Sequence, residues 1–169
     1  MNTMEALLTR RSVRSFTSEA VSEKDVHDLL KAGMQAPSAK NEQPWHFILI
    51  DDSEILHAIP EFHPYSKMLL EAPLAILVCS DRSLETSRAN WLADCSAATQ
   101  NILLAAHAKG LGAVWLGIFP DSTRVFGMQA LLQMPKEIRP VALVAVGHPT
   151  ALPEPVDRFK PERIHHNRW

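Results

Sequence analysis

Four short stretches of the chain are almost continuously apolar, and each has the length of a β-strand. They are residues 45–50 (WHFILI), 74–79 (LAILVC), 113–116 (AVWL) and 141–146 (VALVAV). A strand that is buried on both faces does not alternate between polar and apolar residues. These runs therefore predict a sheet that is covered on both sides.

Helical spacing of apolar residues predicts the elements around this sheet. Asn2, followed by Glu5, indicates the start of a short N-terminal helix, and Ser22 indicates the start of a second helix that ends before Pro37. The longest helix is expected from about 86 to 109, and its many alanines permit close packing against another helix or a partner subunit. Weaker helical signals occur at 55–59, 68–70 and about 122–132.

The chain changes character from His148 onward. Four prolines interrupt this segment, and several arginines and a lysine make it basic. Such a segment cannot form a core of its own, so it is either disordered or wraps around another surface. Phe159, Ile164 and Trp169 are spaced like anchors along an extended arm, which favours wrapping. Since no linker or repeat indicates a second domain, we expect one domain over 1–169, with an extended arm over 148–169.

Composition narrows the function classes. The chain has 169 residues, 46% of them hydrophobic, and a net charge of -2, which is too balanced for a nucleic-acid-binding or membrane-surface protein. No secretory signal or bilayer-spanning run is expected. Cys79 and Cys95 lie inside apolar segments, and we expect both to be small core residues. Because they show no spacing typical of a disulfide or metal site, the expected compartment is the reducing cytoplasm. His165 and His166 would point apart, so we expect no metal site.

Two segments carry candidate chemistry. The stretch 10–14 (RRSVR) places three guanidiniums and a hydroxyl within five residues, and arginine forks match phosphate oxygens. The loop 36–45 (APSAKNEQPW) is stiffened by two prolines and presents a hydroxyl and amides suited to a heterocycle. Taken singly, the first could be a solvated basic patch, or pair with nearby acidic residues. The second could be an ordinary connection between a helix and a strand.

Four blocks in order give the chain a specific resemblance. They are 10–16 (RRSVRSF), 37–45 (PSAKNEQPW), 109–117 (KGLGAVWLG) and 144–149 (VAVGHP). Together they resemble the signatures of the nitroreductase family of FMN-dependent oxidoreductases, and the likeness covers nearly the whole chain. The resemblance implies an α+β fold, in which a central, mostly antiparallel sheet is flanked by helices. It also implies an intertwined homodimer that binds FMN at its interface and exchanges C-terminal arms, each adding a strand to the partner's sheet.

The resemblance further implies which residues contact FMN. The phosphate and ribityl chain would be held by the first block and a late arginine, with Arg14 the candidate cation at the pyrimidine edge and Lys160 a further candidate at the phosphate. Residues of the second block would approach the ring or the ribityl chain, some of them from the second subunit, and the third block would lie along the ring. The implied cofactor contacts are Arg10, Arg11, Ser12, Arg14, Pro37, Ser38, Asn41, Gln43, Trp115, Leu116, Gly117 and Arg158.

The expected activity is hydride transfer from NADH or NADPH through FMN to a nitroaromatic, quinone or related small acceptor, in a ping-pong sequence. The flavin carries the redox chemistry, so no catalytic side chain is required. Two alternatives stay open at this point. One is an FMN-binding carrier or redox sensor without turnover, and the other is a cofactor-free basic surface for an anionic protein.

Overall fold

A four-stranded antiparallel sheet forms the centre of the computed structural model, which describes residues 1–86 and 90–169. The strands are β1 (Trp45–Ile50), β2 (Leu74–Asp81), β3 (Gly112–Gly117) and β4 (Ile138–Gly147), in the spatial order β1-β2-β4-β3. All four predicted strands are therefore confirmed, and β2 and β4 extend further than their apolar runs. β1 and β3 are the edges of the sheet, and each pairs with a single neighbour.

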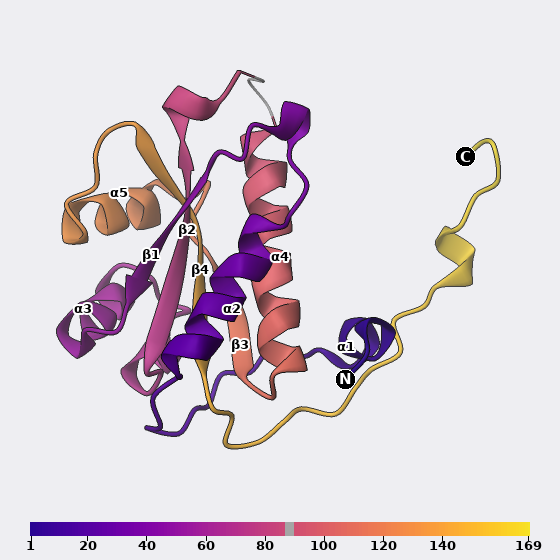
Figure 1. Ribbon diagram of the computed structural model, residues 1–169, viewed down its shortest axis with the longest axis horizontal. Coiled ribbons are helices and arrows are strands. Elements are labelled where there is room, and N and C mark those ends of the chain that lie inside the picture. Colours follow the sequence, from indigo (N-terminus) through magenta and orange to yellow (C-terminus); the bar gives the residue numbers. More distant parts are fainter. Residues whose placement is uncertain (87–89) are drawn as a thin grey trace.

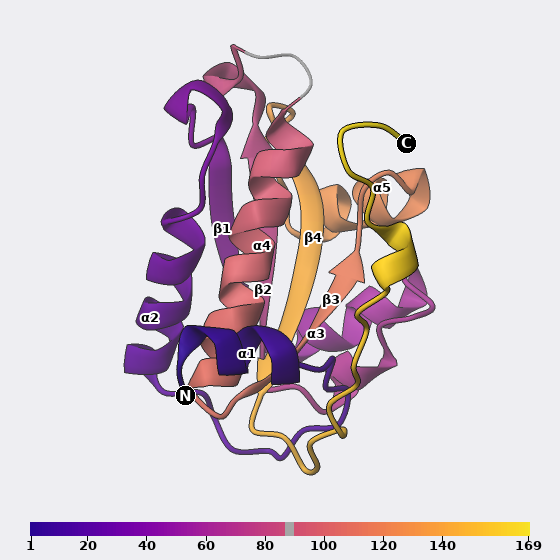
Figure 2. The same ribbon diagram turned by 90° about the vertical axis from the view of Figure 1, so that its right-hand side faces the viewer.

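Helices cover both faces of the sheet (Figures 1 and 2). One face packs against α2 (Glu23–Met34) and α4 (Trp91–Ala108), while the other carries α3 (Ser53–Ala58) and α5 (Ser122–Leu131). Neighbouring residues of β2 enter different cores, since Ile76 belongs to the α2–α4 cluster and Leu77 to the opposite one. This two-sided burial explains the continuous apolar runs of the central strands β2 and β4, whereas the edge strands β1 and β3 are partly exposed. The predicted α+β fold is confirmed.

The predicted helix starts are confirmed by their capping bonds. The Asn2 side chain accepts the Glu5 N–H at 2.9 Å at the start of α1 (Thr3–Thr9), and Ser22 accepts the Asp25 N–H at the start of α2. Helix α2 ends at Met34, before the proline that was expected to stop it. The weaker signals correspond to α3, to short 3-10 turns at Ile59–Glu61 and Lys67–Leu70, and to α5, which confirms the helix expected at about 122–132.

The longest helix begins later than predicted. Thr86 is not helical, residues 87–89 lie outside the described part, and α4 starts at Trp91. The side of α4 that faces the sheet is buried, whereas Leu92 near its start is 38% exposed. Asp94 is 5% exposed, and its Oδ1 accepts the Ala39 N–H at 3.0 Å. No pattern in the sequence predicts a buried carboxylate at this position.

Cys79 and Cys95 are both free and fully buried, as predicted for core residues. Burial raises the pKa of each thiol to about 12. At neutral pH both side chains are therefore thiols rather than reactive thiolates.

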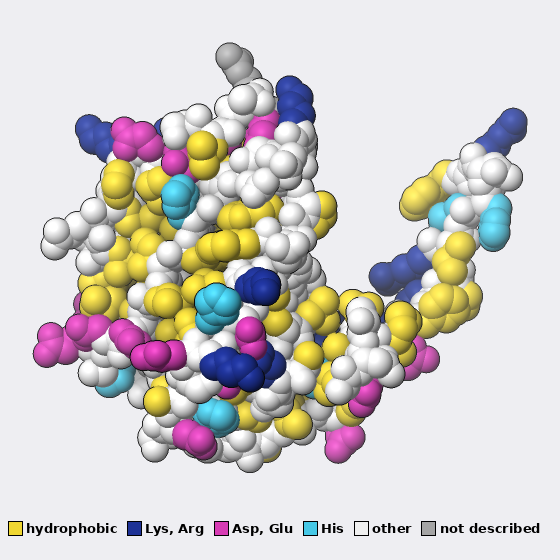
Figure 3. Space-filling model, viewed as in Figure 1, with side chains coloured by type: hydrophobic (Ala, Val, Ile, Leu, Met, Phe, Trp, Pro, Cys, Tyr) yellow, Lys and Arg dark blue, Asp and Glu magenta, His cyan; other side chains and the backbone are white. Residues whose placement is uncertain are grey.

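After Gly147 the chain first pairs with residues 15–17, where the Thr17 N–H donates to the His148 carbonyl at 2.9 Å. It then leaves the body of the protein as an extended arm that contains the short 3-10 turn Pro161–Arg163 (Figure 1). Figure 3 shows hydrophobic, basic and histidine side chains along this projecting arm. Phe159 is 68% exposed, and Trp169 is fully exposed. Within the described residues, no helix combines the length and hydrophobicity that crossing a bilayer demands.

Candidate functional site

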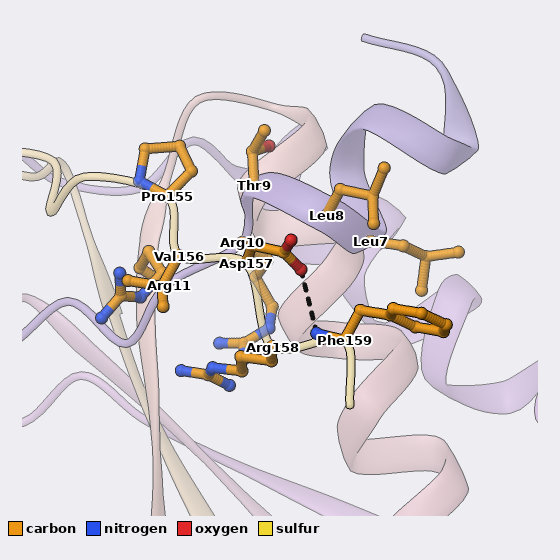
Figure 4. A pocket seen from close by; sticks show the side chains of 10 residues that line it. All are labelled: Leu7, Leu8, Thr9, Arg10, Arg11, Pro155, Val156, Asp157, Arg158 and Phe159. Atoms are coloured by element: carbon orange, nitrogen blue, oxygen red, sulfur yellow. Dashed lines mark hydrogen bonds between the residues drawn. The ribbon is translucent and has the colours of Figure 1, made fainter. Parts of the chain in front are cut away.

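One groove brings together Arg10, Arg11 and Arg158, although Arg158 lies almost 150 residues after the other two in sequence. This arginine groove, lined by residues 7–11 and 155–159, lies between the end of α1 and the arm and has a volume of about 670 Å³. Figure 4 shows the guanidiniums of Arg10 and Arg158 close together and pointing the same way, with Leu7 and Phe159 on the other side. The groove thus has one cationic and one apolar side.

The charges of the arginine groove are not neutralised by the chain itself. Burial lowers the pKa of Arg10, and the positive charges of Arg158 and Arg11 lower it further. Within the described residues none of the three forms an ion pair, and the Asp157 carboxylate accepts the Phe159 N–H at 2.9 Å instead. Arg11 donates to the Glu154 carbonyl. Like charges held together in this way favour a multiply charged anion such as a phosphate.

The segment that follows the arginines is fixed to the open edge of β3. The Val13 N–H donates to the Ala113 carbonyl at 3.0 Å, and the Val13 side chain is buried. This close approach depends on Gly112, because a Cβ there would lie 2.7 Å from Val13 Cγ1. Ser12 lines neither the arginine groove nor the groove described next, whereas Arg14 passes into the latter.

A second groove, the edge groove, runs along the end of β3 and has a volume of about 460 Å³. It brings Arg14 together with Trp115, Leu116 and Gly117, as the sequence predicts, but separates Arg14 from Arg10 and Arg11. Its remaining lining residues are His63, Pro64, Tyr65, Lys67, Met68 and Arg124. Sequence reasoning missed this second set, because no motif marks it and only packing brings it to β3.

Backbone groups at the end of β3 face the edge groove. The Gly117 carbonyl accepts from His63 Nε2 at 3.1 Å and from Arg124 Nη1 at 2.9 Å. In a β-strand the N–H and C=O groups of every second residue point toward the same edge of the strand. Ala113 and Gly117 use the open side, so the Trp115 N–H, midway between them, points there as well. Trp115 can therefore offer an amide donor to a ligand beside two cations, Arg14 and Lys67.

His63 makes stability pH-dependent at this groove. Its side chain is 1% exposed, and burial followed by the nearby charge of Arg124 lowers its pKa. The unfolded chain, whose histidines titrate near about 6.5, then binds the proton more readily than the folded chain. We expect the free energy of unfolding to fall as the pH drops from about 6.5 toward 5, as measured by urea denaturation.

The variant His63→Gln tests this expectation. It should lose part of the pH dependence, while His107, whose pKa is lowered by burial and by Arg10, supplies the remainder. An identical slope in the parent and the variant would show that His63 is not the group responsible.

The second block forms a rigid loop at the opposite end of the molecule. Lys40, Asn41 and Gln43 all have positive φ (52°, 58° and 49°), an uncommon conformation for residues other than glycine. The Gln43 N–H donates to Ser38 Oγ at 3.0 Å, and Gln43 Nε2 donates to Asn41 Oδ1 at 2.9 Å. Together with the bond from Ala39 to Asp94, these contacts hold the Ser38 hydroxyl and both amides in place.

The first and second blocks do not meet within one chain. The second-block loop is tied to Asp94 near the start of α4, whereas Thr9 Oγ1 lies 2.8 Å from His107 Nε2 near its end. These two points of α4 are separated by roughly 20 Å at 1.5 Å per residue. Pro37, Ser38, Asn41 and Gln43 are thus far from the arginine groove (Figure 1).

Comparisons with known proteins identify the family. The chain matches the model of the Nitroreductase family over residues 7–62 and 60–148, and it belongs to this family. A protein of Methanothermobacter thermautotrophicus named "Putative NADH dehydrogenase/NAD(P)H nitroreductase" is 46% identical over 100% of this chain and 88% of its own length. The likeness in sequence thus extends over the whole chain.

Solved structures show the same fold. The "Putative NADH dehydrogenase/NAD(P)H nitroreductase" of Parabacteroides distasonis has a TM-score of 0.95 and 38% identity, with 100% of both chains covered. A "putative nitroreductase in complex with fmn" of Desulfovibrio desulfuricans has a TM-score of 0.86 and 33% identity, and covers 100% of this chain and 98% of its own. The fold is therefore that of nitroreductases.

Proposed function

We propose that the protein is an FMN-dependent NAD(P)H oxidoreductase that acts as a homodimer in the cytoplasm. The observation that carries this proposal is the arginine groove, where Arg10, Arg11 and Arg158 face one another without a carboxylate partner among the described residues. A phosphate monoester carries about -1.5 to -2 charges near neutral pH and would neutralise them. The FMN-bound relative supports the same choice of ligand.

Within this proposal, the edge groove receives the flavin ring. It begins three residues beyond Arg11, so a ligand whose phosphate lies in the arginine groove can extend along β3. The Trp115 N–H would then face the polar edge of the ring, while Arg14 and Lys67 would lie near its pyrimidine side. Cations there stabilise negative charge on the ring. Leu116 and Gly117 would line the ring from the strand.

The second block would come from the other subunit. Pro37, Ser38, Asn41 and Gln43 are too far from the arginine groove to contact the same ligand within one chain. Antiparallel pairing of two copies along α4 would bring the loop of one copy to the grooves of the other. The open edge of β3 and the apolar side chains on α1 and on the arm over 148–169 support a partner that covers them.

FMN, when bound, accepts a hydride from NADH or NADPH and passes electrons to a nitroaromatic, quinone or related small acceptor, the donor and acceptor binding in turn. The chain's own residues bind and orient it. His63, which is buried and holds the Gly117 carbonyl, fixes the end of β3 against which the ring would pack. No side chain is required to form a covalent bond or to act as a general base.

An anaerobic absorbance spectrum of the purified protein, recorded before and after addition of NADPH and then NADH, tests the proposal. We expect a flavin spectrum that bleaches with a nicotinamide donor and recovers when a nitroaromatic or quinone is added. Bound flavin that does not bleach would instead favour a carrier or redox sensor. Failure to bind FMN even after incubation would refute the proposal.

A further inference from the structure

A third groove lies beyond the end of β3 and plays no part in the proposed flavin site. This distal groove, of about 380 Å³, is lined by nine residues, among them three cations, Arg82, Lys136 and Arg139, and two aromatic residues, Phe119 and Phe126. The cations come from the turn after β2, the loop after α5 and strand β4. Three separate segments thus bring positive charge to one place.

Of the three cations of the distal groove, Arg82 and Lys136 have no acidic partner among the described residues, whereas Arg139 has one. Arg139 lies over the Trp91 ring, with its Cζ 3.8 Å from the ring centre, and its Nη1 is 3.5 Å from Glu85 Oε1. Within residues 1–86 and 90–169, Arg82 and Lys136 form no ion pair, and no acidic residue lines the groove. Such a site favours an anion with more than one negative charge.

An apolar wall adjoins these cations. Phe119 packs edge-to-face on Trp91 with ring centres 4.9 Å apart, so its position is fixed. Phe126 is 69% exposed on α5, and Val125 lies beside it in the lining. Aromatic faces next to cations suit a planar base that carries phosphate groups. The ligand class indicated is therefore a phosphorylated nucleoside.

The distal groove lies beside the proposed flavin site. Gly117 and Arg124 line the edge groove, whereas Phe119 and Val125 line the distal groove. Phe119 is two residues beyond Gly117, which places it at most about 7 Å further along the chain. A dinucleotide with one base stacked on a flavin ring in the edge groove can thus extend its other half along the same segment.

We propose that the distal groove binds the adenosine 2′,5′-bisphosphate end of NADPH while the nicotinamide stacks on the flavin ring that the edge groove receives. Arg82 and Lys136 contact the 2′-phosphate, and Phe126 packs against the adenine. This inference rests on the proposed function and goes beyond it, because it selects NADPH over NADH. The missing 2′-phosphate of NADH would leave both cations unpaired.

Calorimetric titration with 2′,5′-ADP, which needs no turnover, tests the binding step. The flavin-loaded parent should bind 2′,5′-ADP about tenfold more tightly than 5′-AMP, since one phosphate contact with charged donors contributes about this factor. The double variant Arg82→Ala/Lys136→Ala should weaken 2′,5′-ADP binding at least about tenfold. The matched control Lys31→Ala removes an exposed charge on α2, outside the groove, and should bind like the parent.

Steady-state kinetics test the selectivity. In the double variant the KM for NADPH should rise about tenfold relative to the KM for NADH, with the flavin content unchanged. Phe126→Ala should raise both KM values. A KM ratio within twofold of the parent, an equal rise for both donors in the double variant, or a parent that does not bind 2′,5′-ADP would overturn the inference.

The two proposals fail in different ways. If the distal groove does not bind NADPH, the flavin should still bleach with a nicotinamide donor, and the proposed oxidoreductase function would stand. A flavin that binds but never bleaches would refute the oxidoreductase, and binding of 2′,5′-ADP that depends on Arg82 and Lys136 would still support the distal groove.

Discussion

Replacing Arg10 with alanine is expected to weaken FMN binding by about ten- to a hundredfold. A hydrogen bond to a charged group contributes about 1.5–3 kcal/mol, and Arg10 faces the same space as Arg158. Without FMN, the three arginines repel one another, so the variant should fold at least as stably as the parent. A weaker FMN binding constant would therefore report a lost contact with the ligand and not a less stable protein. Fluorescence titration of the flavin-free protein with FMN gives the dissociation constant directly.

Two variants serve as controls for the loss at Arg10. Arg10→Lys keeps the positive charge but not the planar fork, and should fall between the parent and Arg10→Ala. Lys31→Ala changes the net charge equally without touching the groove and should match the parent. If Arg10→Ala binds FMN as tightly as the parent, the arginine groove is not the phosphate site.

Removing the arm from Arg158 onward is expected to produce a flavin-poor monomer. The truncation deletes a cation of the arginine groove together with Phe159, Ile164 and Trp169, whose side chains are each more than half exposed within the described chain. In the proposed dimer these side chains are buried against the partner, so their loss removes interface and cofactor ligand at once. Sedimentation velocity and the flavin absorbance of the same sample measure both effects.

The full-length variant Arg158→Ala separates the two contributions of the arm. It should lose FMN affinity while still sedimenting as a dimer, because the apolar anchors stay in place. A truncated protein with an unchanged sedimentation profile and full flavin content would show that the arm contributes to neither.

The sequence alone determined the elements and the family of this protein. Continuous apolar runs specified the four strands and, for β2 and β4, the burial on both faces, because burial on two sides leaves few polar positions in a strand. The helix caps at Asn2 and Ser22 could also be predicted from the sequence, since a cap depends on residues only three positions apart. Patterns of this kind involve only neighbouring residues, so they can be interpreted without the tertiary structure.

Tertiary structure decided how the candidate residues are grouped. In the folded chain Arg158 lies beside Arg10, whereas Arg14 lines a different groove along β3. The second block lies near the other end of α4. Tertiary structure also revealed groups that no motif marks, such as His63, Lys67 and the buried Asp94. Residues from distant segments become neighbours only through packing, and packing depends on the whole chain at once. Sequence blocks therefore identified the family, whereas the grooves and their charges emerged only from the folded chain.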